Sequence, residues 1–127
     1  MARKHNHQMS KDEKGFVTGY IRTKVTPALS SARQHFYDRA SERSFSFEEA
    51  KAVVATGSVV EVHNNASPEY RALVRNQAGT CVVVSLTDWT IVTVYYNAPD
   101  DTHSTLDYNA YRWSVNLVDV VKSLRRS

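Results

Sequence analysis

A histidine and two arginines recur every four residues within a stretch of helical periodicity, at His35, Arg39 and Arg43. Residues four apart lie on adjoining turns of a helix, so the three side chains would form a row about 12 Å long. Histidine can move a proton near neutral pH, and arginine binds phosphate through paired hydrogen bonds. The spacing therefore indicates acid–base chemistry on a phosphodiester.

Two further arginines, Arg71 and Arg75, alternate onto one face of an expected strand. If residues 77–79 form the whole loop to the next strand, Arg71 lies opposite Ser85. Arg75 then lies opposite Cys81, so both arginines stand on a sheet face and not at its rim. A simpler interpretation stays open, in which the helix arginines pair with nearby acids and the strand arginines face solvent.

Other kinds of chemistry have little support in the sequence. His5-Asn6-His7 is a run of adjacent residues and lacks the converging partners of a metal site. Phosphate-binding glycine loops, paired cysteines and the serine or zinc hydrolase motifs are absent from the chain. Cys81 lies in the most apolar stretch and is expected to be a packed thiol. We expect neither a metal nor a cofactor.

The charge of the chain is unevenly distributed. The net charge of its 127 residues is +3, but residues 1–43 hold nine lysines and arginines against four acids, whereas residues 44–127 hold seven against nine. This basic front segment predicts RNA or another polyanion as partner, although a solvated arm explains it equally well. The length suits one domain. With one cysteine and no apolar run near the N-terminus, we expect a cytoplasmic protein without a membrane span.

The front half of the chain is predicted to be helical. Capping boxes at residues 10–13 and 46–49 predict the starts of two helices, the first covering about residues 11–24. Thr26-Pro27 predicts the start of another helix, reaching about Ser44, because proline is favoured at the first helical position. Gly57 is expected to end the helix after the second box in a left-handed conformation.

From Ser58 onward the apolar period changes to two. Strands are predicted at residues 58–63, 69–76, 80–87 and 89–97, joined by short loops that indicate an antiparallel meander. The third of these strands is apolar on both faces and should be internal to the sheet. An apolar stripe over residues 113–124 predicts a C-terminal helix. The fold class is therefore α+β, with N-terminal helices packed on a four-stranded antiparallel sheet.

The stretch from His35 to Tyr95 resembles a family of small bacterial and phage domains of unknown function. Its pattern combines H-x3-R, a helix start (S/F)-x-E-E-(A/V), G-x-(V/I)-x-E, a strand with Y-R and a closing strand (V/I)-x-T-V-Y. The matching residues are His35, Arg39, Arg43, Phe47, Glu48, Glu49, Ala50, Gly57, Val59, Glu61, Tyr70, Arg71, Val92, Thr93, Val94 and Tyr95. That family is similar in plan to the RelE and BrnT toxins, in the barnase, EndoU, colicin and RelE group of metal-independent ribonucleases.

We expect a single domain over residues 1–127, with a basic arm at 1–25 and an extension at 98–127 on either side of a core at 26–97, which the resemblance implies to be RelE/BrnT-like. The resemblance also implies RNA cleavage by attack of a ribose 2′-hydroxyl on the adjacent phosphate. The candidate catalytic residues are His35, Arg39, Arg71, Thr93 and Tyr95. The candidate nucleic-acid-binding residues are Arg22, Lys24, Arg33, Arg43 and Arg75.

Two alternatives stay open at this point. The chain can instead be a non-catalytic phage or mobile-element protein that inhibits a host enzyme or binds nucleic acid through its arm and open sheet face. An antitoxin or host protein is then the candidate partner, and a homodimer a candidate assembly. The sheet face of Thr93 also stays open, because one extra residue in the loop near Thr87-Asp88 reverses it.

Overall fold

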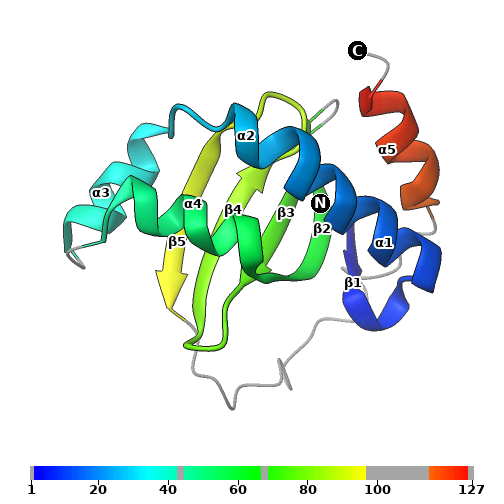
Figure 1. The fold of residues 1–127 in the computed structure, drawn as a ribbon, viewed down its shortest axis with the longest axis horizontal. Coiled ribbons are helices and arrows are strands. Elements are labelled where there is room, and N and C mark those ends of the chain that lie inside the picture. Colours follow the sequence, from blue (N-terminus) through cyan, green and yellow to red (C-terminus); the bar gives the residue numbers. More distant parts are fainter. Residues whose placement is uncertain (1, 43–44, 67–68, 97–114, 126–127) are drawn as a thin grey trace.

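The structure is a computed structural model that describes residues 2–42, 45–66, 69–96 and 115–125. Within these ranges a five-stranded antiparallel sheet carries helices on one face, and a further helix follows near the C-terminus (Figure 1). The predicted α+β class and C-terminal helix are confirmed. The predicted number of four strands is wrong, because a strand at the N-terminus adds a fifth.

Four strands form the predicted meander. They are β2 (Ser58–Ala66), β3 (Glu69–Arg75), β4 (Thr80–Ser85) and β5 (Ile91–Tyr96), and they are neighbours in chain order. Arg71 lies opposite Ser85 and Arg75 opposite Cys81, which is the register predicted from a loop at residues 77–79. β4 lies between β3 and β5 and is buried over almost its whole length, which explains its continuous apolar sequence.

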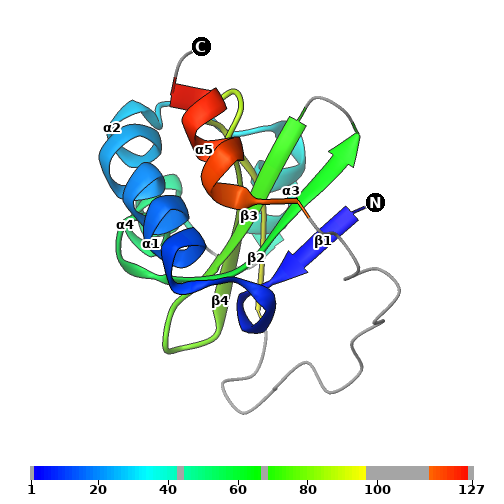
Figure 2. The ribbon, with the colours of Figure 1, turned by 90° about the vertical axis from the view of Figure 1, so that its right-hand side faces the viewer.

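The fifth strand, β1 (Ala2–His5), pairs antiparallel with β2 at the edge of the sheet (Figure 2). A basic arm is predicted over these residues from their charge, and the four mostly polar residues show no apolar alternation that would indicate a strand. Their pairing depends on a partner far along the chain, which local periodicity cannot reveal. A short 3-10 turn, η1 (Asn6–Gln8), then leads from β1 toward the first helix.

Residues 11–28 form one uninterrupted helix. It comprises α1 (Lys11–Tyr20), the π-helical segment η2 (Ile21–Val25) and α2 (Thr26–Ala28). The prediction that Thr26 caps a new helix is wrong, since its backbone is helical and the chain first becomes extended at Leu29. The wide π turn just before Pro27 supplies the physical reason. It relieves the clash that a proline ring makes with the carbonyl four residues earlier.

Two shorter helices follow, α3 (Gln34–Glu42) and α4 (Phe47–Thr56). Both predicted capping boxes are confirmed, with Ser10 and Ser46 each accepting a hydrogen bond from the amide of the glutamate three residues later. The predicted left-handed cap at Gly57 is wrong, because its φ of −73° and ψ of 173° are extended. Glycine is required there for space, since a Cβ would lie 2.6 Å from the Val53 carbonyl oxygen and 2.7 Å from Val74 Cγ1.

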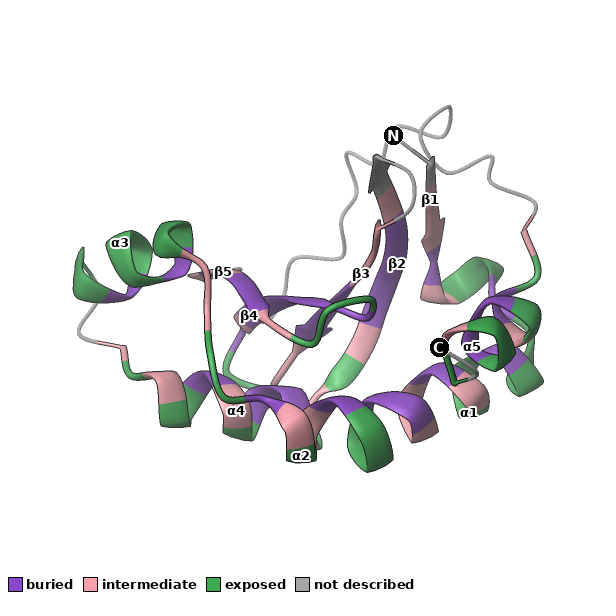
Figure 3. Cartoon of the chain, turned by 90° about the horizontal axis from the view of Figure 1, so that it is seen from above, coloured by how far each residue is buried: buried purple, intermediate pink, exposed green. Residues whose placement is uncertain are grey.

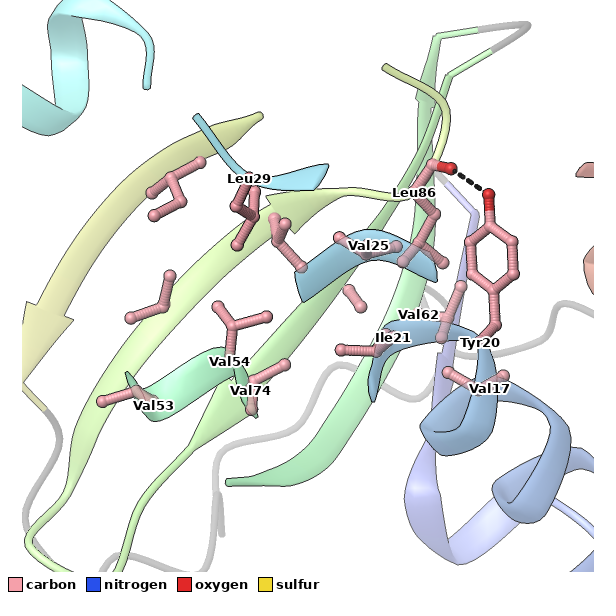
Figure 4. Packing of buried hydrophobic residues seen from close by; sticks show 14 of the residues in the cluster. Val17, Tyr20, Ile21, Val25, Leu29, Val53, Val54, Val62, Val74 and Leu86 are labelled. Carbon is pink, nitrogen blue, oxygen red and sulfur yellow. Dashed lines mark hydrogen bonds between the residues drawn. The ribbon is translucent and has the colours of Figure 1, made fainter. Parts of the chain in front are cut away.

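The main core lies between the helices and the sheet (Figure 3). Alternate residues of the strands, such as Val62, Val74 and Val82, pack against apolar residues of the helix 11–28 and of α4 (Figure 4). Tyr20 is buried there, and its hydroxyl donates to the Leu86 carbonyl at 3.0 Å. A second buried cluster occupies the opposite face of the sheet and consists of Val60, Leu73, Cys81, Val83 and Val92.

The two ends of the chain meet at Glu13, a buried residue of α1. Its Oε2 accepts a hydrogen bond from Lys4 Nζ of β1 at 2.6 Å and another from the Leu117 amide at 2.9 Å. Leu117 is the first residue of α5 (Leu117–Arg125), the helix that packs on α1. These contacts lower the pKa of Glu13 to about 2, against the opposing effect of its burial. None of the helices in the described ranges has the length and apolar character needed to cross a bilayer.

Replacing Glu13 with glutamine should destabilise the protein by about 2 kcal/mol, since it removes the charge from three hydrogen bonds. The folded-state pKa lies below the ordinary value of 4.5, so the stabilisation is present above pH 4.5 and is lost as the pH falls toward 2. Urea unfolding over this pH range should show that the free energies of unfolding of the wild type and of Glu13→Gln become equal in acid. An unfolding free-energy difference that does not change with pH would contradict the role given to the carboxylate.

Gly57→Ala should lower the free energy of unfolding by about 1–3 kcal/mol, because the new methyl group overlaps backbone and core atoms. Gly15→Ala is the matched control, as nothing lies within 4 Å of a Cβ at Gly15. That substitution should raise stability by about 0.5–1 kcal/mol through helix propensity. Thermal unfolding of both variants checks the pair, and equal effects at the two sites would contradict this packing.

Candidate functional site

An imidazole and two guanidinium side chains share one register row across β1, β2 and β3. Arg3 lies opposite His63, and His63 lies opposite Arg71. His63 and Arg71 point to the face away from the helices, because they alternate with Val62 and Ala72 of the main core, and Arg3 is in register with His63 on the same face. Neighbouring strands are about 4.8 Å apart, so His63 has an arginine one strand away on each side.

A hollow of about 220 Å³ lies over this part of the sheet. Its polar lining comes from β1, β2, β3 and β5, and its apolar lining belongs to the second buried cluster. The residues that line it are Arg3, Glu61, His63, Arg71, Leu73, Val83, Val92, Thr93 and Tyr95. The sheet thus brings an imidazole, two guanidiniums, a carboxylate and two hydroxyls into one hollow.

His63 is only 8% exposed, and its Nδ1 is a buried atom without a hydrogen-bond partner among the described residues. Burial lowers the pKa of His63 to about 4, and the charges of Arg3 and Arg71 act in the same direction. Glu69 opposes them. The imidazole is therefore neutral at physiological pH.

The carboxylate in the hollow belongs to Glu61, a buried residue two positions before His63 on β2. Glu61 Oε2 lies 3.9 Å from Arg3 Nε. This ion pair holds the guanidinium of Arg3, on the edge strand β1, on the same face of the sheet as the His63 imidazole. The Arg3 side chain is 36% exposed and that of Glu61 8%, so the desolvation cost of the pair falls mainly on the Glu61 carboxylate.

Arg71 is held in place by Glu69, two residues earlier on β3. Arg71 Nε donates to Glu69 Oε1 at 3.0 Å, and the same oxygen accepts from Arg33 at 2.6 Å. Arg33 also contacts Asp88 Oδ2 at 3.1 Å in the loop between β4 and β5. These contacts lower the pKa of Glu69 and raise that of Arg33, although burial acts against both shifts.

The faces of Thr93 and Tyr95 depend on an irregularity in β5. Val83 lies opposite Thr93 while Val84 lies opposite Ile91, so Val92 is an extra residue in the ladder. This bulge directs Thr93 and Tyr95 to the same face as Arg71. Of the five predicted catalytic residues, the structure brings these three together.

The other two predicted catalytic residues, His35 and Arg39, are exposed on α3. α3 packs against β5 through Phe36 and Ala40, which belong to the main core. Neither His35 nor Arg39 lines the hollow. The predicted convergence of the helix row with Arg71 is therefore not seen, since the two sets stand on different faces of the sheet.

The predicted nucleic-acid-binding residues are dispersed. Arg33 joins the Glu69 network, and Arg75 is half-buried on the face of Arg71. Arg22 and Lys24 are exposed on the helix 11–28. Arg43 lies outside the described residues.

Sequence reasoning passed over Arg3, Glu61 and His63 as site residues. Strand alternation places Glu61 and His63 on one face, so the period-two pattern of the sequence could have identified this pair. Arg3 could not be identified in this way, because its strand carries no apolar alternation. Over the described ranges, no three His, Cys, Asp or Glu side chains gather closely enough to hold a metal ion.

Comparison with known proteins yields one match. The model of a family described as a domain of unknown function (DUF4258) matches residues 33–96. The matched stretch contains α3, α4 and strands β2 to β5, so Arg3 is the only residue lining the hollow that lies outside it among those described. No curated protein and no solved structure matches the chain.

The imidazole of His63 should titrate with a midpoint of about 4, measured by NMR of its ring protons. Arg71→Ala and Arg3→Ala should each raise this midpoint, because each removes a nearby positive charge. Arg22→Ala is the matched control and should leave it unchanged, since Arg22 lies on the helix layer. A midpoint at the ordinary value of 6.5 in the wild type would contradict the burial and charge environment described here.

Proposed function

The chain belongs to the DUF4258 family, and we propose that it is a metal-independent endoribonuclease, acting as a toxin or a host-directed effector. The reaction takes place in the hollow around His63. The resemblance to RelE and BrnT toxins, carried by residues 35–95, supports this class of activity. The basic front segment of the chain supports a polyanionic substrate.

The observation that carries the proposal is the row Arg3, His63 and Arg71. A neutral, buried imidazole between two guanidiniums suits a phosphodiester with a hydroxyl beside it. The guanidiniums neutralise the phosphate, and the imidazole accepts the proton of the hydroxyl. His63 thereby takes the role that the sequence analysis gives to His35.

In the proposed reaction, His63 removes the proton from a ribose 2′-hydroxyl. The 2′-oxygen forms a bond to the adjacent phosphorus, and the bond from phosphorus to the 5′-oxygen breaks. Arg3 and Arg71 stabilise the charge that develops on the phosphate oxygens. The imidazolium then returns its proton to the leaving 5′-oxygen, so the products are a 2′,3′-cyclic phosphate and a 5′-hydroxyl. Thr93 and Tyr95 supply hydroxyl groups that orient the phosphate.

A second function is favoured by the contact between Arg71 and Glu69. A carboxylate already occupies one edge of the Arg71 guanidinium, at 3.0 Å from Nε. A non-catalytic module that binds a host protein or nucleic acid would retain such a pair as part of its surface. The two functions differ in whether RNA is cut.

Purified protein should cleave single-stranded RNA in the presence of EDTA and leave 2′,3′-cyclic phosphate ends. His63→Ala and Arg71→Ala should each reduce the rate about a hundredfold or more, as expected for loss of general base or of charge stabilisation. Circular dichroism of each variant establishes that it is folded. The rate and the product ends, followed on denaturing gels, are the measurements.

His35→Ala is the matched control, since it makes the same change on the exposed face of α3 and should retain activity. If His35→Ala loses activity while His63→Ala keeps full activity, the active site lies at His35 and Arg39 on α3 instead. If folded wild-type protein leaves RNA intact, the catalytic proposal fails and the binding module takes its place.

A further inference from the structure

A second hollow, of about 290 Å³, lies next to the first along β2 and β3. It is lined by Asn6, Ser58, Val60, Arg75, Asn76 and Gln77. Val60 belongs to the buried cluster on the face of the first hollow, and Arg75 shares the face of Arg71 by strand alternation. The two hollows therefore follow one another on the same face of the sheet.

β2 and β3 each contribute to both hollows. β3 supplies Arg71 to the first and Arg75 to the second, four residues or about 13 Å further along. The chain that supplies Arg3 reaches the second hollow at Asn6, where β1 ends. This spacing is too long for two contacts to one phosphate, and it suits two phosphates with a further phosphate between them along an extended strand.

The space between the two arginines also has a suitable lining. Arg75 lies opposite Cys81, and Cys81 lies opposite Tyr95, so Tyr95 stands in the register row of Arg75 while lining the first hollow. Leu73 and Val83 form an apolar floor beside it. An aromatic ring in the row of Arg75 and an apolar floor between the two arginines form a pattern on which unpaired bases stack.

The second hollow also offers groups that recognise bases. Asn6, Asn76 and Gln77 present amides, which can donate to and accept from base edges. The Asn6 Oδ1 is buried and has no hydrogen-bond partner within the described ranges. The Asn76 Oδ1 already accepts from the Thr80 amide at 2.9 Å, so its amino group is the part left to bind a ligand.

We propose that the second hollow is a subsite for the next nucleotides of a single-stranded nucleic acid, which runs along β2 and β3 from the Arg3 and Arg71 end to Arg75. This inference deepens the proposed ribonuclease function, on which it rests for the identity of the first hollow. It specifies an unpaired substrate longer than a dinucleotide. Duplexes are excluded because their bases are paired and cannot lie on Tyr95 and the apolar floor.

Fluorescence anisotropy with fluorescein-labelled oligothymidylate tests the subsite without a cleavage readout, because deoxyribose lacks the attacking 2′-hydroxyl. The wild type should bind a labelled octanucleotide more tightly than a dinucleotide. Arg75→Ala should weaken octanucleotide binding about tenfold, and reduce the slope of log affinity against log salt by about 0.7, as for the loss of one phosphate contact. Its binding of the dinucleotide should stay unchanged.

Lys122→Ala removes one positive charge from an exposed position on α5 and is the matched control. Equal weakening by Lys122→Ala and Arg75→Ala would overturn the subsite, since binding would then depend on charge alone. Binding of a duplex octanucleotide as tight as that of the single strand would overturn it as well. Arg75-dependent oligothymidylate binding in a protein that does not cut RNA would uphold the subsite and remove only the catalytic function.

Discussion

The carboxylate of Glu13 joins the two ends of the chain, and the geometry of the site face depends on it. Glu13 Oε2 accepts from Lys4 of β1 and from the first amide of α5, while its Oε1 accepts from the Ser10 amide. Lys4 points toward the helices, so its neighbour Arg3 points to the other face. A buried ion pair on one side of the sheet thereby fixes a guanidinium on the other side.

The two faces of the sheet serve different purposes. The helix face is a continuous apolar core, which supplies most of the stability of the fold. The other face alternates rows of polar and apolar residues, with His63 and Glu61 buried next to Leu73 and Val83. Burying an imidazole and a carboxylate costs free energy that an apolar residue would not cost. That cost falls on the face that carries the hollow.

Local chemistry could be predicted from the sequence, and pairing over long distances could not. The loop at residues 77–79 determined the register of Arg71 correctly, and each capping box marked a helix start. The side of Thr93 depended on one bulged residue, Val92, which alternation alone cannot detect. The helix start predicted at Thr26-Pro27 was wrong because Ile21 and Val25 are buried in the core. Their burial keeps the helix continuous across a sequence that usually caps a new helix.

The pairing of β1 also bears on the order in which the molecule assembles. β2 to β5 are joined by short connections, so their contacts close small loops and form early. The amide of Leu117 and the carboxylate of Glu13 are 104 residues apart in the chain, and their contact closes a much larger loop. Arg3 and His63 are 60 residues apart, so the pairing of β1 with β2 also closes a larger loop than the meander does. The row of Arg3, His63 and Arg71 is therefore complete only in molecules in which β1 has paired with the sheet.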